Sequence, residues 1–134
     1  MTAKPNADTA VAPKVAQPGE HFFEMAKLDT VHGGPDYSSA IGTAVTGERM
    51  MTALMRMPAG TGSDPHYHAN EQWIYVIEGV LEMSVGEVTQ QARPGTVVYI
   101  PSNAVHNARV IGDADVVFFT VKDTSQGLQG TRKD

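Results

Sequence analysis

The sequence predicts an all-β fold, a single small sandwich or barrel built of short strands. Short apolar runs alternate with Gly, Pro, Asn and Asp from His21 to about Lys122, and no segment shows a convincing helical stripe. Many short strands at this spacing are typical of sandwiches and barrels. The length of 134 residues suits one domain with a substantial core.

Taken in order, the apolar runs predict nine strands, and turn residues separate them. We expect strands near residues 22–28, 40–46, 49–57, 73–78, 80–85, 88–91, 96–100, 105–111 and 115–122. Turns are expected at residues 32–36, 58–65, 85–87, 93–95, 101–103 and 112–115. The first run, HFFEMAKL, could instead form one or two helical turns.

The two ends of the chain differ from this pattern. Residues 1–19 are rich in Ala, Pro, Thr and Lys without periodicity, which predicts a flexible arm. Residues 20–123 form the expected barrel. The polar tail at 124–134 is punctuated by glycine, so it is either loose or packed over the barrel.

Composition excludes several classes of protein. There is no cysteine, which excludes disulfides, thiolate metal sites and cysteine nucleophiles. The net charge of −5 comes from mixed acidic and basic residues, so we expect no nucleic-acid partner and no membrane anchor. The N-terminal stretch lacks the apolar core of a signal peptide, and we expect a cytoplasmic protein.

The expected strand WIYVIE is apolar on both faces. Ile74 and Val76 share one face, while Trp73, Tyr75 and Ile77 share the other. A barrel strand needs only one apolar face, so something is expected to cover the second. A homodimer is our preferred explanation, although a flanking segment of the same chain would serve as well.

Three histidines stand out as candidate metal ligands. His66 and His68 lie two residues apart, so in an extended strand they project from the same face. His106 follows a second segment, GTVVYIPSNAVH, that contains an apolar strand and a proline turn. A pair of histidines at this spacing is weak evidence by itself, and the third histidine strengthens it.

These two segments resemble the motifs of the cupin superfamily. The first motif is Gly, five residues, His-x-His, three or four residues, Glu, six residues, Gly, which Gly60, His66, His68 and Gly79 match. The second is Gly, five residues, Pro-x-Gly, two residues, His, three residues, Asn, of which Gly95, Pro101 and His106 match. The resemblance covers residues 40–122 and implies a small antiparallel β-barrel of the jelly-roll kind that binds a metal. Fifteen residues, 80–94, separate the two motifs.

The chain departs from the family pattern at three positions. Asn103 replaces the glycine after the proline, as a turn with positive φ tolerates, and Val110 replaces the final asparagine. The glutamate position holds Gln72, because counting from His68 or from Gly79 both lead to it and not to Glu71. The resemblance therefore implies a metal site of His66, His68, Gln72 and His106. Glu71 could orient a histidine or lie solvated at the rim.

A neutral glutamine ligand would leave a divalent ion with its full +2 charge. Such a centre favours anionic or oxygen-rich small molecules and could stabilise an enolate. Imidazole ligands leave the metal open among Fe, Mn, Ni, Zn, Co and Cu. Our interpretation is an enzyme with isomerase, lyase or dioxygenase chemistry on a small oxygenated acid or diketone, with its general base unidentified. The alternatives are a non-enzymatic cupin for sensing or storage and a metal-free barrel.

Overall fold

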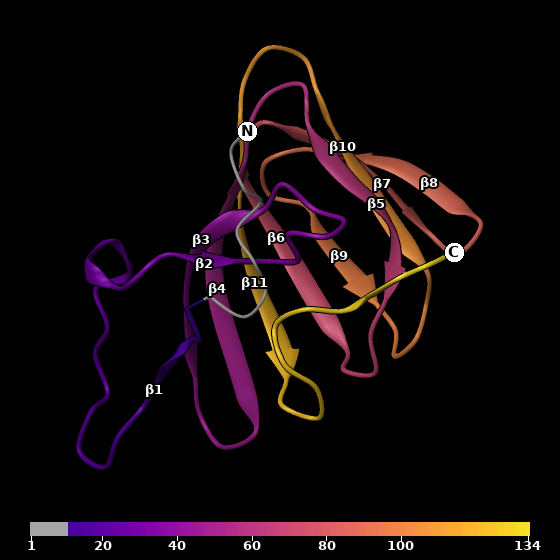
Figure 1. Cartoon of the computed structure of the whole chain (residues 1–134). Coiled ribbons are helices and arrows are strands. Elements are labelled where there is room, and N and C mark those ends of the chain that lie inside the picture. Colours follow the sequence, from indigo (N-terminus) through magenta and orange to yellow (C-terminus); the bar gives the residue numbers. More distant parts are fainter. Residues whose placement is uncertain (1–10) are drawn as a thin grey trace, which may run out of the picture.

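The computed structural model describes residues 11–134, and the predicted arm therefore lies partly outside the described residues. Two β-sheets face each other in a jelly-roll arrangement, which confirms the all-β prediction (Figure 1). The larger sheet has the order β1-β3-β4-β11-β6-β9, with β2 also paired to β3, and the smaller has the order β12-β5-β10-β7-β8. All pairings are antiparallel except that of β1 with β3.

The strands follow one another with short turns along most of the chain. In the larger sheet they are β1 (Lys14–Val15), β2 (Val31–His32), β3 (Ile41–Thr46), β4 (Met50–Met57), β6 (Gln72–Glu78), β9 (Val97–Ile100) and β11 (Val116–Asp123). In the smaller sheet they are β5 (Gly62–Tyr67), β7 (Val80–Val85), β8 (Val88–Ala92), β10 (His106–Ile111) and β12 (Thr131–Arg132). Within the described residues the sole helical element is a 3₁₀ turn, η2 (Met25–Lys27), and no helix there could cross a membrane.

The core lies between the two sheets and follows the alternation of the strands. On β6 the side chains of Ile74 and Val76 are buried, while Trp73, Tyr75 and Ile77 are exposed. Phe118 on β11 and Leu81 on β7 pack into the same core. This period of two directs polar residues of the same parity inward as well, and several of them lie at one end of the core.

The structure differs from the predicted strands in several places: β1, β2 and β12 were not predicted, and two predicted segments need correction. The strand at 22–28 is wrong, whereas the alternative of a helical turn in this run is confirmed by η2; Phe22 there is almost fully exposed. The turn predicted at 58–65 extends too far, because β5 already begins at Gly62. A Cβ at that glycine would lie 2.2 Å from the carbonyl oxygen of Ala108, so glycine permits the close approach of β5 and β10 rather than marking a turn.

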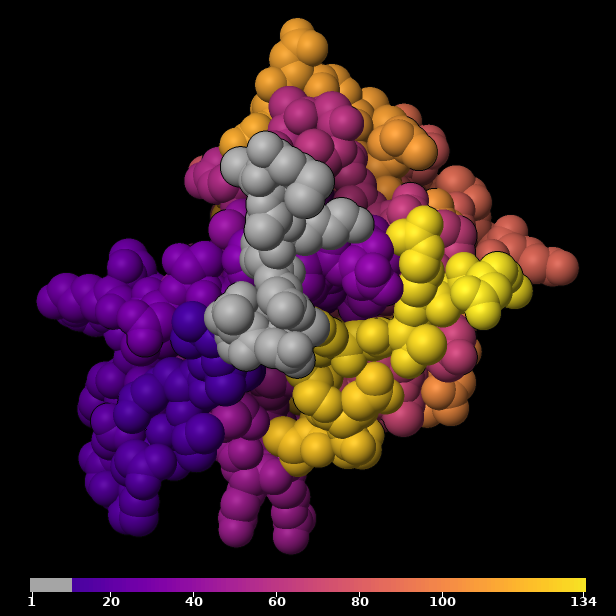
Figure 2. All heavy atoms as spheres, in the orientation of Figure 1, coloured from indigo at the N-terminus to yellow at the C-terminus, as the bar shows by residue number. Residues whose placement is uncertain are grey.

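Both ends of the described chain lie against the sheets. Lys14 and Val15 pair with Val45 and Thr46 of β3. In the C-terminal segment, β12 pairs with β5, and Leu128 packs against the core. This segment, yellow in Figures 1 and 2, runs across the face of the molecule that these views show. Of the two alternatives for the tail, it is therefore the packed one that the structure shows.

Candidate metal centre

Three histidines from the smaller sheet meet at one end of the core. His106 begins β10 and lies directly opposite His66 of β5, and His68 follows just after β5 ends. One nitrogen from each ring lies within 4.8 Å of the others, and all three side chains are buried. The pairing of β5 with β10 therefore brings together residues separated by 40 positions in the sequence.

Each imidazole is oriented through its Nδ1 atom by a backbone carbonyl two residues away. The pairs are His66 with Asp64 (2.7 Å), His68 with Asn70 (2.9 Å) and His106 with Ala104 (2.9 Å). A carbonyl oxygen only accepts, so in neutral His66 and His106 the Nδ1 atom carries the proton. His68 can carry its proton on Nδ1 in the same way, and in that tautomer all three Nε2 atoms have free lone pairs, as metal-binding histidines require.

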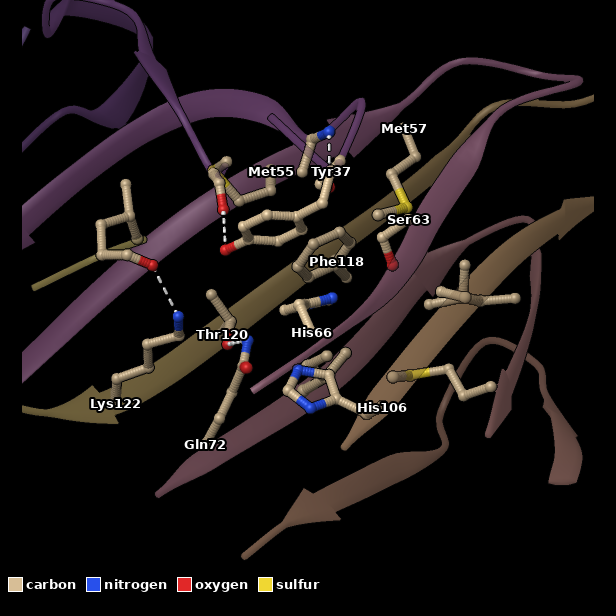
Figure 3. A pocket seen from close by; sticks show the side chains of 18 residues that line it. Tyr37, Met55, Met57, Ser63, His66, Gln72, His106, Phe118, Thr120 and Lys122 are labelled. Carbon is tan, nitrogen blue, oxygen red and sulfur yellow. Dashed lines mark hydrogen bonds between the residues drawn. The ribbon is translucent and has the colours of Figure 1, made fainter. Parts of the chain in front are cut away.

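Gln72 reaches the same place from the opposite sheet, at the start of β6. Its Oε1 atom lies 3.0 Å from Nε2 of His68, and its Nε2 atom donates to the hydroxyl of Thr120 at 2.8 Å. That hydroxyl in turn donates to the carbonyl of Trp73, so it can only accept from the amide. The hydrogen-bond chain therefore fixes the amide with its oxygen toward the histidines (Figure 3).

The contact between His68 and Gln72 fits a bound cation. A neutral imidazole has one N–H group, and both nitrogens of His68 face oxygen acceptors. Whichever nitrogen is protonated, one lone pair of the ring then faces an oxygen lone pair. A positive ion bound by Nε2 of His68 and Oε1 of Gln72 removes this repulsion, so the donor set suits a divalent metal.

Burial also keeps these histidines neutral. Desolvation lowers the pKa of His66 to about 4 and that of His106 to about 3, and it lowers the pKa of His68 as well. The positive charge of Lys122 lowers all three further. The unprotonated form that binds metals is consequently the stable form at neutral pH.

Glu71 lies outside the centre. It is exposed, its backbone N–H donates to a carboxylate oxygen of Asp123 at 2.8 Å, and its own carboxylate accepts from the hydroxyl of Tyr99. The structure therefore places Glu71 at the exposed rim and not beside a histidine. Asn103 adopts a positive φ of 62°, the conformation expected where the family pattern has glycine. Val110 is part of the apolar core.

A cavity of about 50 Å³ adjoins two of the histidines, Gln72 and Thr120. This volume accommodates a few water molecules or one end of a small ligand. Its apolar wall includes Met55, Met57 and Phe118.

Two polar residues of this cavity were not anticipated from the sequence. Tyr37 stacks on the ring of His66, with centroids 4.0 Å apart, and lies in a loop that offered no signal. Lys122 projects inward from β11 (Figure 3). Its parity with Val116, Phe118 and Thr120 could have identified it as a buried charge.

Comparisons with known proteins agree with this architecture. The model of the cupin domain matches residues 53–122, which include all four candidate ligands. That match covers more than half of the chain.

The chain belongs to the cupin family.

Among similar proteins, this cupin is 32% identical over 110 residues to the H2HPP isomerase of Bacillus subtilis, but it spans only 44% of that protein's length. The solved structure of the polyketide cyclase RemF from Streptomyces resistomycificus superposes with a TM-score of 0.70 at 15% identity, covering 86% of both chains. KdgF from Halomonas sp. superposes with a TM-score of 0.67 at 20% identity, covering 80% of this chain and 96% of the other. At these identities the two structures establish the fold alone.

Proposed function

We propose that this cupin is a metal-dependent enzyme acting on a small oxygenated organic acid or diketone. His66, His68, His106 and Gln72 would hold one divalent transition metal. The observation that carries the proposal is the convergence of nitrogens from three buried imidazoles, with an amide oxygen that Thr120 holds in place beside His68. Imidazole and amide donors suit Fe, Mn, Ni, Zn, Co and Cu.

The bound ion would supply Lewis-acid chemistry, polarising an oxygen atom of the substrate. The proposed ligands determine the net charge of the metal site, because all four of them are neutral. The site would keep a net charge of +2, where a glutamate in place of Gln72 would reduce it to +1. In a cavity with a low effective dielectric, this difference strengthens the attraction for carboxylates and enolates.

The remaining residues hold and enclose the reacting groups. The carbonyl groups of Asp64, Asn70 and Ala104 fix the imidazoles, and Tyr37 stacks on the His66 ring. Met55, Met57 and Phe118 limit the number of water molecules near the ligands. Such an arrangement suits isomerase, lyase or dioxygenase chemistry on a substrate whose polar end enters the cavity.

The relatives support this range of chemistry without narrowing it. An isomerase shares 32% identity over 110 residues, and a polyketide cyclase shares the fold. Cupin barrels host many reactions, so the choice among them depends on the site and not on the fold. The site favours substrates with adjacent oxygen atoms, because the proposed metal ion and the polar side chains around it would contact the same small molecule.

A turnover screen tests the proposal. Metal-stripped protein reconstituted separately with Fe²⁺, Mn²⁺, Ni²⁺, Zn²⁺, Co²⁺ and Cu²⁺ would be assayed against keto acids, diketones and unsaturated uronates. Turnover that requires metal and is lost in His106→Ala supports the enzyme. Tight, metal-dependent binding of these compounds without turnover would contradict it and favour a cupin used for sensing or storage.

We also propose a homodimer that covers the exposed face of β6 and β9. Trp73, Tyr75 and Ile77 of β6 lie beside Val97 and Tyr99 of β9, and each of these side chains is between 41% and 55% exposed. Contiguous apolar surface of this kind is typical of interfaces. Sedimentation equilibrium should give twice the mass of one chain, and Trp73→Glu should shift the protein toward the monomer. A parent protein that is monomeric at high micromolar concentration would contradict the dimer.

A further inference from the structure

Lys122 is a buried cation without a countercharge in the part of the chain described, residues 11–134. Its side chain is 5% exposed, and no carboxylate in this range forms an ion pair with it. The strand pattern forces this position, because residues of the same parity on β11 all point into the core. Burying an unpaired ammonium group is costly, so its presence calls for an explanation.

The local hydrogen bonding accounts for Lys122 only in part. Its Nζ atom donates to the backbone carbonyl of Leu128 at 2.7 Å, and an ammonium group has three N–H donors. Burial lowers the pKa of Lys122 to about 8, so the amine is still mainly protonated at neutral pH. A neutral carbonyl is a weaker partner for this charge than a carboxylate oxygen would be.

Lys122 lines the same cavity as the candidate metal ligands. It lies directly opposite Gln72 in the pairing of β11 with β6, and both side chains point into the cavity with those of His66 and His106 (Figure 3). Leu128, whose carbonyl accepts from Lys122, belongs to the C-terminal segment and also lines the cavity. A ligand that entered would therefore meet the ammonium group and the histidines within one small enclosure.

We propose that Lys122 is the carboxylate anchor of this cavity, and that the substrates are small monocarboxylates with a second oxygen close to the acid group. This inference rests on the proposed function, because it takes the cavity beside the histidines as the substrate site. The ligand's carboxylate replaces or joins the carbonyl of Leu128 at Nζ. Its other oxygen then lies on the side of the cavity where the histidines and Gln72 converge.

Pyruvate and pyruvamide provide a matched pair of probes, because they have the same shape and differ in the charge at one end. Their binding would be measured by isothermal titration calorimetry on metal-free and zinc-loaded protein. The parent should bind pyruvate at least tenfold more tightly than pyruvamide in both forms. Lys122→Met should lose that preference in the metal-free form, while its zinc content and its affinity for pyruvamide stay within twofold. Lys27→Met, which removes an exposed lysine, should behave as the parent.

Two results would overturn the anchor: equal or undetectable binding of both probes by the metal-free parent, and an unchanged preference in metal-free Lys122→Met. A purely structural Lys122 would alter thermal stability in that variant, but the parent would not distinguish the probes when metal-free. Should Lys122→Met fail to fold, the Cε resonance of Lys122 in ¹³C-lysine-labelled parent gives the same answer, because only pyruvate should shift it.

The same titrations distinguish the proposal for Lys122 from the proposal of a metal site. Preference for pyruvate that depends on Lys122 in a protein that takes up no zinc would support the anchor and contradict the metalloenzyme. Stoichiometric zinc with pyruvate binding independent of Lys122 would contradict the anchor and leave the metal centre in place.

Discussion

The two walls of the candidate site differ in how they present polar groups. The smaller sheet contributes three imidazoles, each fixed by its own local carbonyl within two residues. The larger sheet contributes Gln72, Thr120 and Lys122, whose interactions extend across strands and to the C-terminal segment. The histidine wall is therefore set up locally, whereas the opposite wall depends on the register between β6 and β11 and determines charge and orientation at the site.

The largest expected effect concerns the protonation of the histidine wall in metal-free protein. Because burial lowers the folded-state pKa of His66 to about 4 and of His106 to about 3, the unfolded chain takes up protons first as the pH falls below 6.5. Stability is then lost as the pH falls from about 6.5 toward 4. Each of the two histidines should remove about 2 kcal/mol from the unfolding free energy by pH 5.

Urea unfolding of chelator-treated protein at pH 7 and pH 5 would measure this loss. His106→Gln should reduce this difference by about 2 kcal/mol, because the contribution of one of the three buried imidazoles is gone. A parent protein equally stable at both values would show that the histidines are not held neutral by burial.

Removing one histidine should weaken the metal site next most strongly. His106→Ala deletes one of the proposed ligands, so affinity for Zn²⁺ should fall by at least roughly 100-fold, or about 3 kcal/mol. Competition with a chromophoric chelator would measure it. His21→Ala removes an exposed histidine remote from the motif and should leave affinity unchanged; equal affinity in both variants would contradict the site.

A smaller effect is expected on the opposite wall. Thr120→Val keeps the shape of the side chain but removes the hydroxyl that orients Gln72, so metal affinity should fall about tenfold. The matched control is Thr89→Val, which removes the hydroxyl of an exposed threonine that contacts Ser84, away from the proposed ligands. If Thr120→Val binds metal as the parent does, the amide is oriented by the metal itself and not by the larger sheet.

The smallest effect is expected at Glu71, which precedes Gln72 in the sequence but lies outside the proposed metal site. Glu71→Gln changes an exposed carboxylate whose side-chain partner is Tyr99, so stability should change by less than about 0.5 kcal/mol. Zinc affinity, measured by the same competition, should stay within twofold. A loss comparable to that of Thr120→Val would bring Glu71 back into the centre.

The sequence revealed the histidine wall better than the opposite wall for a physical reason. Histidine is uncommon in strands, and its spacing in two short motifs marks the site even before the sheet is known. Thr120 and Lys122 lie in an otherwise apolar strand, where their meaning depends on which strand pairs beside them. Fold class and most strands follow from the period of two, but the role of Gly62 required knowledge of how closely β10 approaches β5.

The first run, near residues 22–28, was mispredicted for a related reason. Apolar residues there suggested a strand, yet a strand also needs a partner, and none lies beside Phe22 in the described structure. Tyr37 illustrates the converse, because a loop residue becomes part of the site only through stacking on His66.

If the two walls hold one metal ion between them, elemental mass spectrometry on the parent beside Gln72→Ala should detect it. The proteins would be purified without chelators or a histidine tag. We expect close to one equivalent of a divalent transition metal in the parent and a clear loss in the variant. No metal in the parent after reconstitution, or full occupancy in Gln72→Ala, would contradict a metal site shared by the two walls.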